Sequence, residues 1–432
     1  MAGEWVEVAL ADICREVRYG YTASATEHPT GTRFLRVTDI ASGALDWKSV
    51  PFCEIDDDDF ERYRLEPGDI VIARMGTIGV SALVRERVRA VAASYLIRHR
   101  IDETLSDPRF VSYILRSPAY WDFVWSHGGG GAVQPNINAK VLGEFRFVLP
   151  PLPEQRAIAH ILGTLDDKLE LNRRMSETLE QMARALFQAW FVDFEPVRAK
   201  MEGRWRRGES LPGLPAHLYD LFPDRLVDSE LGEIPEGWEV GCVDDVFDLT
   251  MGQSPPGETY NEVGEGIPFY QGRADFTFRF PERRVYCTAP TRFAKKGDTL
   301  ISVRAPVGAI NMALEDCAIG RGVAAARHKA GAKSYTYYFM QGLADVFSRF
   351  ESEGTVFGSI SKKDFHAIQC VIVPSQVVEA FEQLCEPIDD RIEGAEIESR
   401  TLAGLRDALL PKLISGALRV KDAERFLEAR GL

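Results

Sequence analysis

The hydrophobic residues between Leu152 and Phe194 recur mostly at spacings of three and four positions. Glu, Lys, Arg and Gln fill most of the places between them, so the segment has one apolar and one polar face. This pattern is typical of a helix that packs along a second helix. Pro151 and Pro153 stand where a helix can begin, and Pro196 prevents its extension beyond about residue 195. We predict a helix on the order of 60 Å long, at about 1.5 Å per residue. Its seam, the row of residues that faces the other helix, is predicted to consist of Ile158, Ile161, Leu165, Met175, Leu179, Met182 and Leu186.

A second segment, from Val377 to about Ile414, repeats this pattern. At a constant offset, Leu165-Asp166-Asp167-Lys168-Leu169-Glu170 aligns with Ile388-Asp389-Asp390-Arg391-Ile392-Glu393. Two apolar seams agree easily by chance, but a charged motif that agrees in the same register does not. We therefore interpret the chain as an internal duplication whose two long helices pair antiparallel about a pseudo-two-fold axis. Asn172 and Glu398 interrupt the seams, and polar residues at such positions fix the register of a helix pair. The second seam is predicted to consist of Leu384, Ile388, Leu402, Leu405 and Leu409.

The segments that precede the two helices also resemble each other. Glu66-Pro67-Gly68-Asp69 leads into a strand-like run at 70–73, and Lys296-Gly297-Asp298 leads into another at 299–302. The predicted fold class is α+β, with two tandem mixed α/β domains separated by two long antiparallel coiled-coil helices. The expected boundaries are 1–150 for the first domain, 151–195 for the central helix, 196–229 for a Pro/Gly-rich linker, 230–375 for the second domain, and 376–432 for the C-terminal helix and tail.

Composition and charge limit the possible classes of protein. The sequence is 45% hydrophobic and 27% charged, with no apolar run near the ~18 residues of a membrane span and no signal-peptide pattern in MAGEWVEVAL. Its seven cysteines are scattered without a C-x-x-C pair, which favours a reduced, cytoplasmic protein over a disulfide framework or a zinc site. The net charge of -14 argues against non-specific binding to nucleic acid, so any contact with DNA requires local basic grooves or basic partners.

The sequence lacks the motifs of an enzyme active site. It has no G-x-S-x-G nucleophile elbow, no phosphate-binding loop, no H-E-x-x-H metal site, no N-P-P-Y/F motif of adenine methyltransferases and no G-x-G-x-x-G cofactor turn. We interpret His127-Gly128-Gly129-Gly130 as part of a flexible loop and the acidic run at 56–59 as a solvated turn. We therefore assign no catalytic residue, no metal and no cofactor to this chain.

Polar and aromatic side chains are concentrated on glycine-rich loops in both domains. Arg, Gln and Asn can form paired hydrogen bonds with guanine and adenine edges, whereas Ser, Thr and Tyr suit phosphate groups. Each loop alone gives weak support, because surface loops are commonly rich in these residues, but their recurrence in both halves strengthens the set. The candidate DNA-binding residues are Tyr19, Tyr21, Thr22, Ser24, Arg36, Arg74, Thr77, Gln134, Asn136, Gln253, Ser254, Tyr270, Gln271, Arg273, Arg304 and Arg321.

Several motifs resemble those of the specificity (S) subunits of type I restriction–modification enzymes, over essentially the whole chain. They are LPPLPEQR at 149–156, LDDK at 165–168, NRR at 172–174, MARALF at 182–187, WFVDF at 190–194, LGEIP at 231–235 and LLPKLISG at 409–416. The resemblance implies two target-recognition domains, each binding one half of a split site in double-stranded DNA. It also implies that the long helices set the gap between the half-sites and dock two methyltransferase (M) subunits, which use S-adenosylmethionine to methylate adenine. Two restriction/translocase (R) subunits that use ATP and Mg would complete the complex, in which this chain is non-catalytic.

Three alternatives stay open at this point. The chain could be the S subunit of a methylation-only system without a nuclease partner, a coiled-coil protein scaffold with no role in DNA recognition, or an enzyme that acts alone. The duplication favours the recognition subunit, because it gives two domains held by a helical spacer. The loops of the two domains differ greatly in sequence, so we expect two different half-sites and a target that is not a palindrome.

Overall fold

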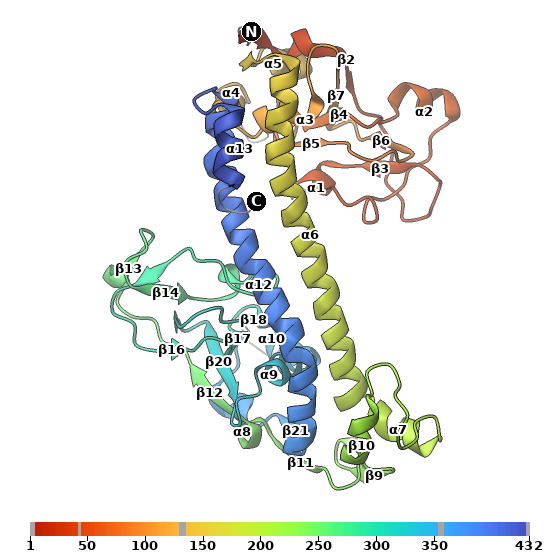
Figure 1. Ribbon diagram of the computed structural model, residues 1–432, viewed down its shortest axis with the longest axis vertical. Coiled ribbons are helices and arrows are strands. Elements are labelled where there is room, and N and C mark those ends of the chain that lie inside the picture. The colour runs from red at the N-terminus through yellow and green to blue at the C-terminus, as the bar shows by residue number, and fades with distance from the viewer. Residues whose placement is uncertain (1–4, 42–44, 129–134, 353–357, 429–432) are drawn as a thin grey trace. The chain divides into compact units, whose positions relative to one another are not determined.

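The computed structural model describes residues 5–41, 45–128, 135–352 and 358–428, and it divides into two units (Figure 1). The first unit consists of Met1–Glu170 and Ser399–Leu432, and the second of Leu171–Glu398. Each unit therefore contains one mixed α/β domain and one stretch of each long helix.

The first domain is built on a four-stranded antiparallel sheet in the order β2-β7-β4-β5. All five residues of β4 are buried, as the apolar run Ile-Val-Ile-Ala predicts for a central strand, and Asp69 at its start is paired with Arg100. A further antiparallel pair joins β1 to β8, and a parallel pair joins β3 to β6. The strands are β1 (Val6–Ala9), β2 (Cys14–Tyr19), β3 (Arg33–Leu35), β4 (Asp69–Ala73), β5 (Ser81–Leu83), β6 (Ala90–Ala92), β7 (Leu96–Ile101) and β8 (Arg146–Leu149). The helices are η1 (Leu10–Ile13), α1 (Val37–Ile40), α2 (Asp57–Tyr63), α3 (Pro108–Ile114), α4 (Pro118–His127) and α5 (Ala139–Gly143).

The second domain repeats this topology. Its four-stranded sheet has the order β12-β20-β17-β18, an antiparallel pair joins β11 to β21, and β14 pairs in parallel with β19 inside a five-stranded sheet. The strands are β11 (Glu239–Cys242), β12 (Phe247–Met251), β13 (Tyr260–Asn261), β14 (Ile267–Tyr270), β15 (Tyr286–Cys287), β16 (Phe293–Ala294), β17 (Thr299–Val303), β18 (Val307–Met312), β19 (Cys317–Ile319), β20 (Val323–His328) and β21 (Gln369–Ile372). The helices are α8 (Val243–Val246), η3 (Gly257–Thr259), η4 (Arg273–Asp275), α9 (Lys333–Gly342), α10 (Ala344–Ser352) and α11 (Lys362–His366).

The two long helices are α6 (Leu152–Phe191) and α12 (Ser375–Ile414), each of 40 residues. In the first unit, Glu154 of α6 accepts a hydrogen bond from Arg419 just beyond α12, and Asp166 of α6 accepts one from Arg406 on α12. In the second unit, Asn172 Nδ2 donates to Glu398 Oε2 at 2.7 Å. The residue numbers rise along one helix as they fall along the other, so the helices are antiparallel in both units. The predicted antiparallel helix pair is confirmed, and the structure adds that the two polar seam residues contact each other.

Among the predicted seam residues, the burial of Met182 departs from the prediction. The other predicted seam residues are each buried or half-buried: Ile158, Ile161, Leu165, Met175, Leu179, Leu186, Leu384, Ile388, Leu402, Leu405 and Leu409. Met182, however, is 57% exposed, and the neighbouring Ala183 is fully buried in its place. The prediction counted only large apolar side chains, whereas the seam of α6 also passes through Asn172, Ser176 and Ala183, which are polar or small.

The segment predicted as a linker at 196–229 is packed rather than extended. It contains α7 (Glu195–Met201), η2 (Ala216–Leu221) and β9 (Leu226–Ser229), which pairs with β10 (Gly232–Pro235). Trp205 and Phe222 are buried and join the core around Trp190 at the end of α6. The Pro and Gly residues that suggested a linker alternate with aromatic and leucine side chains, and these side chains pack. A short helix, α13 (Val420–Glu428), follows α12.

Every helix within the described ranges is too short or too polar to cross a lipid bilayer.

Candidate nucleic-acid interface

In the first unit, segments from distant parts of the chain meet at one end of the four-stranded sheet. The backbone N–H of Arg74 donates to the carbonyl of Tyr95 (2.9 Å), and the carbonyl of Arg74 accepts from the N–H of Ile137 (3.0 Å). The guanidinium of Arg74 lies 4.8 Å from the centre of the Tyr19 ring. Asn136, which precedes Ile137, is exposed. The structure therefore brings together Tyr19, Arg74 and Asn136 from the predicted set.

The rest of the predicted set in this domain is divided. Thr22, Ser24 and Thr77 are exposed and available to a ligand. Tyr21 is half-buried and packs on the ring of Tyr63, at 5.3 Å between centres. The side chain of Arg36 is held by Asp39 at the start of α1, with the closest contact at 2.9 Å between Nη2 and Oδ1. Gln134 lies outside the described residues.

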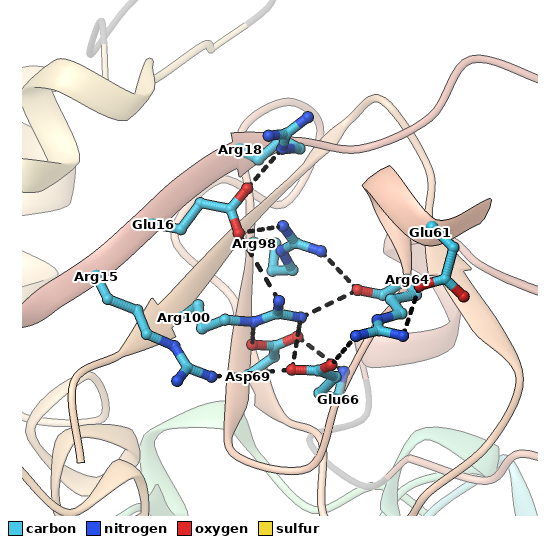
Figure 2. Close-up of polar contacts among 9 residues, drawn as sticks. All are labelled: Arg15, Glu16, Arg18, Glu61, Arg64, Glu66, Asp69, Arg98 and Arg100. Carbon is cyan, nitrogen blue, oxygen red and sulfur yellow. Dashed lines mark hydrogen bonds and ion pairs between the residues drawn. The ribbon is translucent and has the colours of Figure 1, made fainter. Parts of the chain in front are cut away.

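A network of alternating arginines and carboxylates lies on one face of β2, β4 and β7 (Figure 2). Arg100 donates to both carboxylate oxygens of Asp69, at 2.8 Å each. Arg98, which is 3% exposed, contacts Glu16 at 2.8 Å and donates to the carbonyl of Arg64. Burial lowers the pKa of Arg98, whereas the hydrogen bond to Asp69 raises the pKa of Arg100. Because the charges largely neutralise one another, the network positions the strands rather than forming an anion site.

In the second unit, three loops meet at the equivalent end of the sheet. The N–H of Gln253 donates to the carbonyl of Ile319 (3.0 Å), and Arg321 Nε donates to Ser254 Oγ (3.3 Å). The carbonyl of Gln271 lies so close to Gly322 that a Cβ there would be 2.3 Å from its oxygen. The structure thus brings together Gln253, Ser254, Gln271 and Arg321.

A glycine at the end of β2 and another at the end of β12 permit these close approaches. A Cβ on Gly20 would lie 2.2 Å from the carbonyl oxygen of Ala93, and one on Gly252 would lie 2.1 Å from that of Gly320. Real Cβ atoms do not approach so closely, so only glycine fits at these two positions. The same requirement at equivalent places is a structural sign of the duplication.

Tyr270 was predicted to bind DNA, but the structure places it in the core. It is 2% exposed and packs with Phe276 and Ile319. Side chains alternate across a strand, and both faces of β14 are buried: Phe269 packs with Cys287 and Ala318, and Tyr270 belongs to a different core cluster. Gln271 and Arg273, just beyond the strand, are exposed, although Arg273 donates to the carbonyl of Phe276.

Arg304 is exposed, but it is not the strict counterpart of Arg74. The carbonyl of Arg74 accepts from Ile137, and the carbonyl that accepts from the corresponding Ile360 belongs to Val303. The two arginines are therefore offset by one residue in the aligned repeats. Because successive residues of an extended chain point to opposite sides, this offset changes where each side chain is presented.

Sequence reasoning missed exposed side chains beside both clusters. Tyr95, whose carbonyl binds Arg74, is 55% exposed, and Phe293 is 51% exposed on β16. Arg292 precedes Phe293, and its carbonyl accepts from Ile319 at 3.1 Å. No periodic pattern marks these residues. Only the alignment of Ser94-Tyr95 with Arg321-Gly322 could have indicated Tyr95.

Other kinds of site find little support. Within the described ranges, no group of three His, Cys, Asp or Glu side chains is arranged to hold a metal ion. All seven cysteines lie in those ranges as free thiols, five of them buried. Burial raises the pKa of the Cys53 thiol to about 11, which makes it a poor nucleophile at neutral pH.

Comparison with known proteins agrees with the duplicated architecture. Residues 3–181 match the family described as "Type I restriction modification DNA specificity domain". The chain is 28% identical over 428 residues to the putative type I restriction enzyme MjaX specificity subunit of Methanocaldococcus jannaschii, which covers 97% of this chain and 94% of the relative. It is 22% identical over 369 residues to the MjaIX specificity subunit of the same organism, covering 82% and 78% of the two chains. The chain is therefore similar to type I specificity subunits over nearly its whole length.

A solved type I S subunit shows the same fold as this chain. The type I S subunit from M. genitalium has a TM-score of 0.60 to this chain, at 16% identity, over 95% of this chain and 96% of the other. The predicted architecture of mixed α/β domains with two long helices is therefore the fold of an S subunit.

Proposed function

We propose that this chain is the DNA sequence-recognition subunit of a type I restriction–modification complex. The observation that supports it best is the repeated placement of polar loops. Each domain brings an arginine, a glutamine or asparagine, and a tyrosine or serine to the equivalent end of its own four-stranded sheet. Each domain also packs on the antiparallel helices. Arginine, glutamine and asparagine are the side chains that distinguish base edges in the major groove.

The two half-sites of the target differ. At equivalent positions the first domain carries Tyr19 and Tyr21 where the second carries Met251 and Gln253. The side chain of Tyr95 has no counterpart at Gly322. Since different side chains at equivalent places present different hydrogen-bonding groups, the recognised site is bipartite and asymmetric.

The chemistry of the complex belongs to its partners. Two M subunits bind S-adenosylmethionine and methylate adenine, and two R subunits use ATP and Mg to translocate and cut DNA. The chain contributes no catalytic residue and acts in the cytoplasm, where the DNA is. Its net charge of -14 supports a division of labour in which the partners that close around the duplex make most phosphate contacts.

The test is to co-express the chain with its neighbouring methyltransferase gene in a methylation-free host and to map methylated adenines by single-molecule sequencing. A split, asymmetric motif with a fixed internal gap is the expected result. Replacing Gln253 and Arg321 by alanine should relax one half of that motif, and replacing Arg74 and Asn136 should relax the other. Exposed Arg87, which lies outside both clusters, is the control.

The scaffold alternative makes the opposite prediction. A stable complex without methylation, or one whose DNA binding is unchanged when Arg74 and Arg304 are both replaced, would remove the recognition role and leave a protein scaffold. A methylation-only system would give the same motif without a neighbouring nuclease–translocase gene.

A further inference from the structure

One arginine of the second domain is buried between the two long helices. Arg279 lies between η4 and β15, and its side chain is 1% exposed. Its Nη2 contacts Asp389 Oδ1 at 2.7 Å, and its Nη1 lies 3.4 Å from Glu180 Oε2. Glu180 belongs to α6 and Asp389 to α12, so a single side chain of the domain binds both helices. Its guanidinium also stacks on Tyr337, 3.5 Å from the ring centre.

In the first unit, the aspartate that corresponds to Asp389 has a different set of partners. Asp166, the counterpart of Asp389 in the repeated motif, accepts from Tyr113 (2.8 Å) and from two arginines, Arg116 of the domain (3.1 Å) and Arg406 of α12 (3.0 Å). At the constant offset of the repeat, the position of Arg406 corresponds to Ala183 on α6. The first unit therefore pairs this aspartate with one arginine of the domain and one of a helix, whereas in the second unit a single arginine of the domain contacts carboxylates of both helices.

The segment that carries Arg279 also carries part of the candidate DNA-binding cluster. Asp275 Oδ2 accepts from the N–H of Gln271 (2.7 Å), which shapes the loop at Gln271–Arg273. The carbonyl of Arg279 accepts from the N–H of Met312 on β18 (2.9 Å). The stretch from Gln271 to Arg279 thus begins with candidate DNA-binding residues and ends with Arg279, which contacts both long helices.

A buried ion pair is a poor way to gain stability but a good way to define a position. Apolar side chains of similar volume commonly stabilise a core at least as well. Charge-assisted hydrogen bonds from one planar guanidinium to two carboxylates, in contrast, are satisfied only in a narrow range of geometries. This difference points to placement of the domain, rather than stability, as the role of Arg279.

Building on the proposed function, we propose that Arg279 is a positioning residue. It holds the Gln271–Arg273 loop at a fixed place on the helix pair and thereby sets how strictly the complex requires one gap length between the half-sites. Without the anchor, the second domain would accept half-sites displaced by one base pair.

The test uses the complex of the full chain with its methyltransferase subunits and three DNA duplexes. One carries the mapped site, and the others carry gaps one base pair longer and shorter. The variant is R279M with E180Q and D389N, which removes the charges together and leaves no unpaired ion. We expect the ratio of methylation rates between the native and altered gaps to fall about tenfold. A duplex with a mutated first half-site should still be rejected.

The matched control is R406M in the first unit, which removes an arginine that joins helix to helix while Asp166 keeps its contacts with Tyr113 and Arg116 of the first domain. It should leave the gap ratio unchanged. If the triple variant assembles and its gap ratio equals that of the wild type, the proposal is wrong. If the triple variant does not assemble, R279K decides, since lysine keeps the charge but cannot hold both carboxylates in one plane, and an unchanged ratio in R279K also overturns the proposal. Failure of the wild type to methylate any duplex would instead count against the proposed function.

Discussion

Glu382 shows how a single residue of a long helix can complete a domain. It lies on α12, and its Oε1 accepts from the N–H of Tyr335 at 2.6 Å, in the first turn of α9. The N-cap residue of α9 is Ala332, whose side chain cannot accept a hydrogen bond. The equivalent helix of the first domain, α3, is capped by its own Asp107. The second domain therefore relies on the helix pair for a cap that the first domain supplies itself.

This cap makes stability depend on pH. Burial, the largest effect, raises the pKa of Glu382 from 4.5 to about 7. Because the folded-state pKa is the higher one, the stability contributed by protonation is fully present below pH 4.5 and is lost as pH rises through 7. Glu382→Gln keeps the acceptor and removes the charge, so the variant should be more stable at pH 8 by about 1–2 kcal/mol and should lose part of the pH dependence.

Thermal unfolding of the full chain at pH 5 and pH 8 measures this effect. Glu379→Gln, an exposed site on the same helix, makes the same change in charge without altering a buried group. Equal pH dependence in the Glu382 variant and the wild type would contradict the assignment.

Asp69 and Asp298, at the start of the central strands β4 and β17, give a second prediction about single residues. Asp69 binds Arg100 and Asp298 binds Arg327 in the same two-point geometry. Burial differs, however, since the Arg100 side chain is 14% exposed and that of Arg327 is 49% exposed. Asp69→Asn should cost about 3 kcal/mol of unfolding free energy because it removes the two-point partner of a mostly buried guanidinium, which keeps only longer carboxylate contacts, to Glu66 and Glu16, whereas Asp298→Asn should cost about 1 kcal/mol. Urea unfolding compares the two, and equal costs would mean that burial does not decide the strength of these pairs.

At the scale of elements, sequence reasoning succeeded where a pattern has a period. The three–four spacing predicted α6 and α12, and the repeated Asp-Asp motif correctly aligned Asp166 with Asp389, which both accept a hydrogen bond from a tyrosine of their own domain. It failed where one position decides the outcome. Met182 and Ala183 both fit the apolar pattern, and only the packing of the partner helix selects the smaller. Tyr270 lies one residue from exposed Gln271, and the sequence does not reveal that β14 is buried on both faces up to its last residue.

The choice between Met182 and Ala183 can be tested by a reversed pair of substitutions. Ala183 has no exposed surface, so Ala183→Leu should destabilise the chain by about 1–3 kcal/mol through overpacking of the seam. Met182→Ala, at an exposed position, should change stability by less than about 0.5 kcal/mol. Thermal or urea unfolding distinguishes the two sites, and a larger cost for Met182→Ala would restore the seam predicted from the sequence.

At the scale of the whole molecule, duplication followed by divergence explains which features are shared. The sheet order, the close-approach glycines and the aspartates of α6 and α12 recur in both halves, because each half needs the same framework. The candidate DNA-binding residues, the helix caps and the source of the buried arginine differ. A framework kept in duplicate, with different surfaces on each copy, is what recognition of two unlike half-sites requires.

If the long helices set the gap between the two half-sites, shortening both helices should change that gap. Residues 172–175 of α6 and 395–398 of α12 correspond at the constant offset of the repeat, and Asn172 bonds both Ala395 and Glu398. Deleting both segments removes these polar partners together. Four residues make slightly more than one helical turn, so the seams on either side stay nearly in phase, and each helix shortens by about 6 Å. At about 3.4 Å per base pair, the gap in the methylated motif should shorten by about two base pairs while both half-sites stay the same. Deleting only residues 172–175 is the control, because it mismatches the two seams and should prevent a stable complex. A double deletion that assembles, methylates DNA and keeps the original gap would show that the helices do not set the spacing.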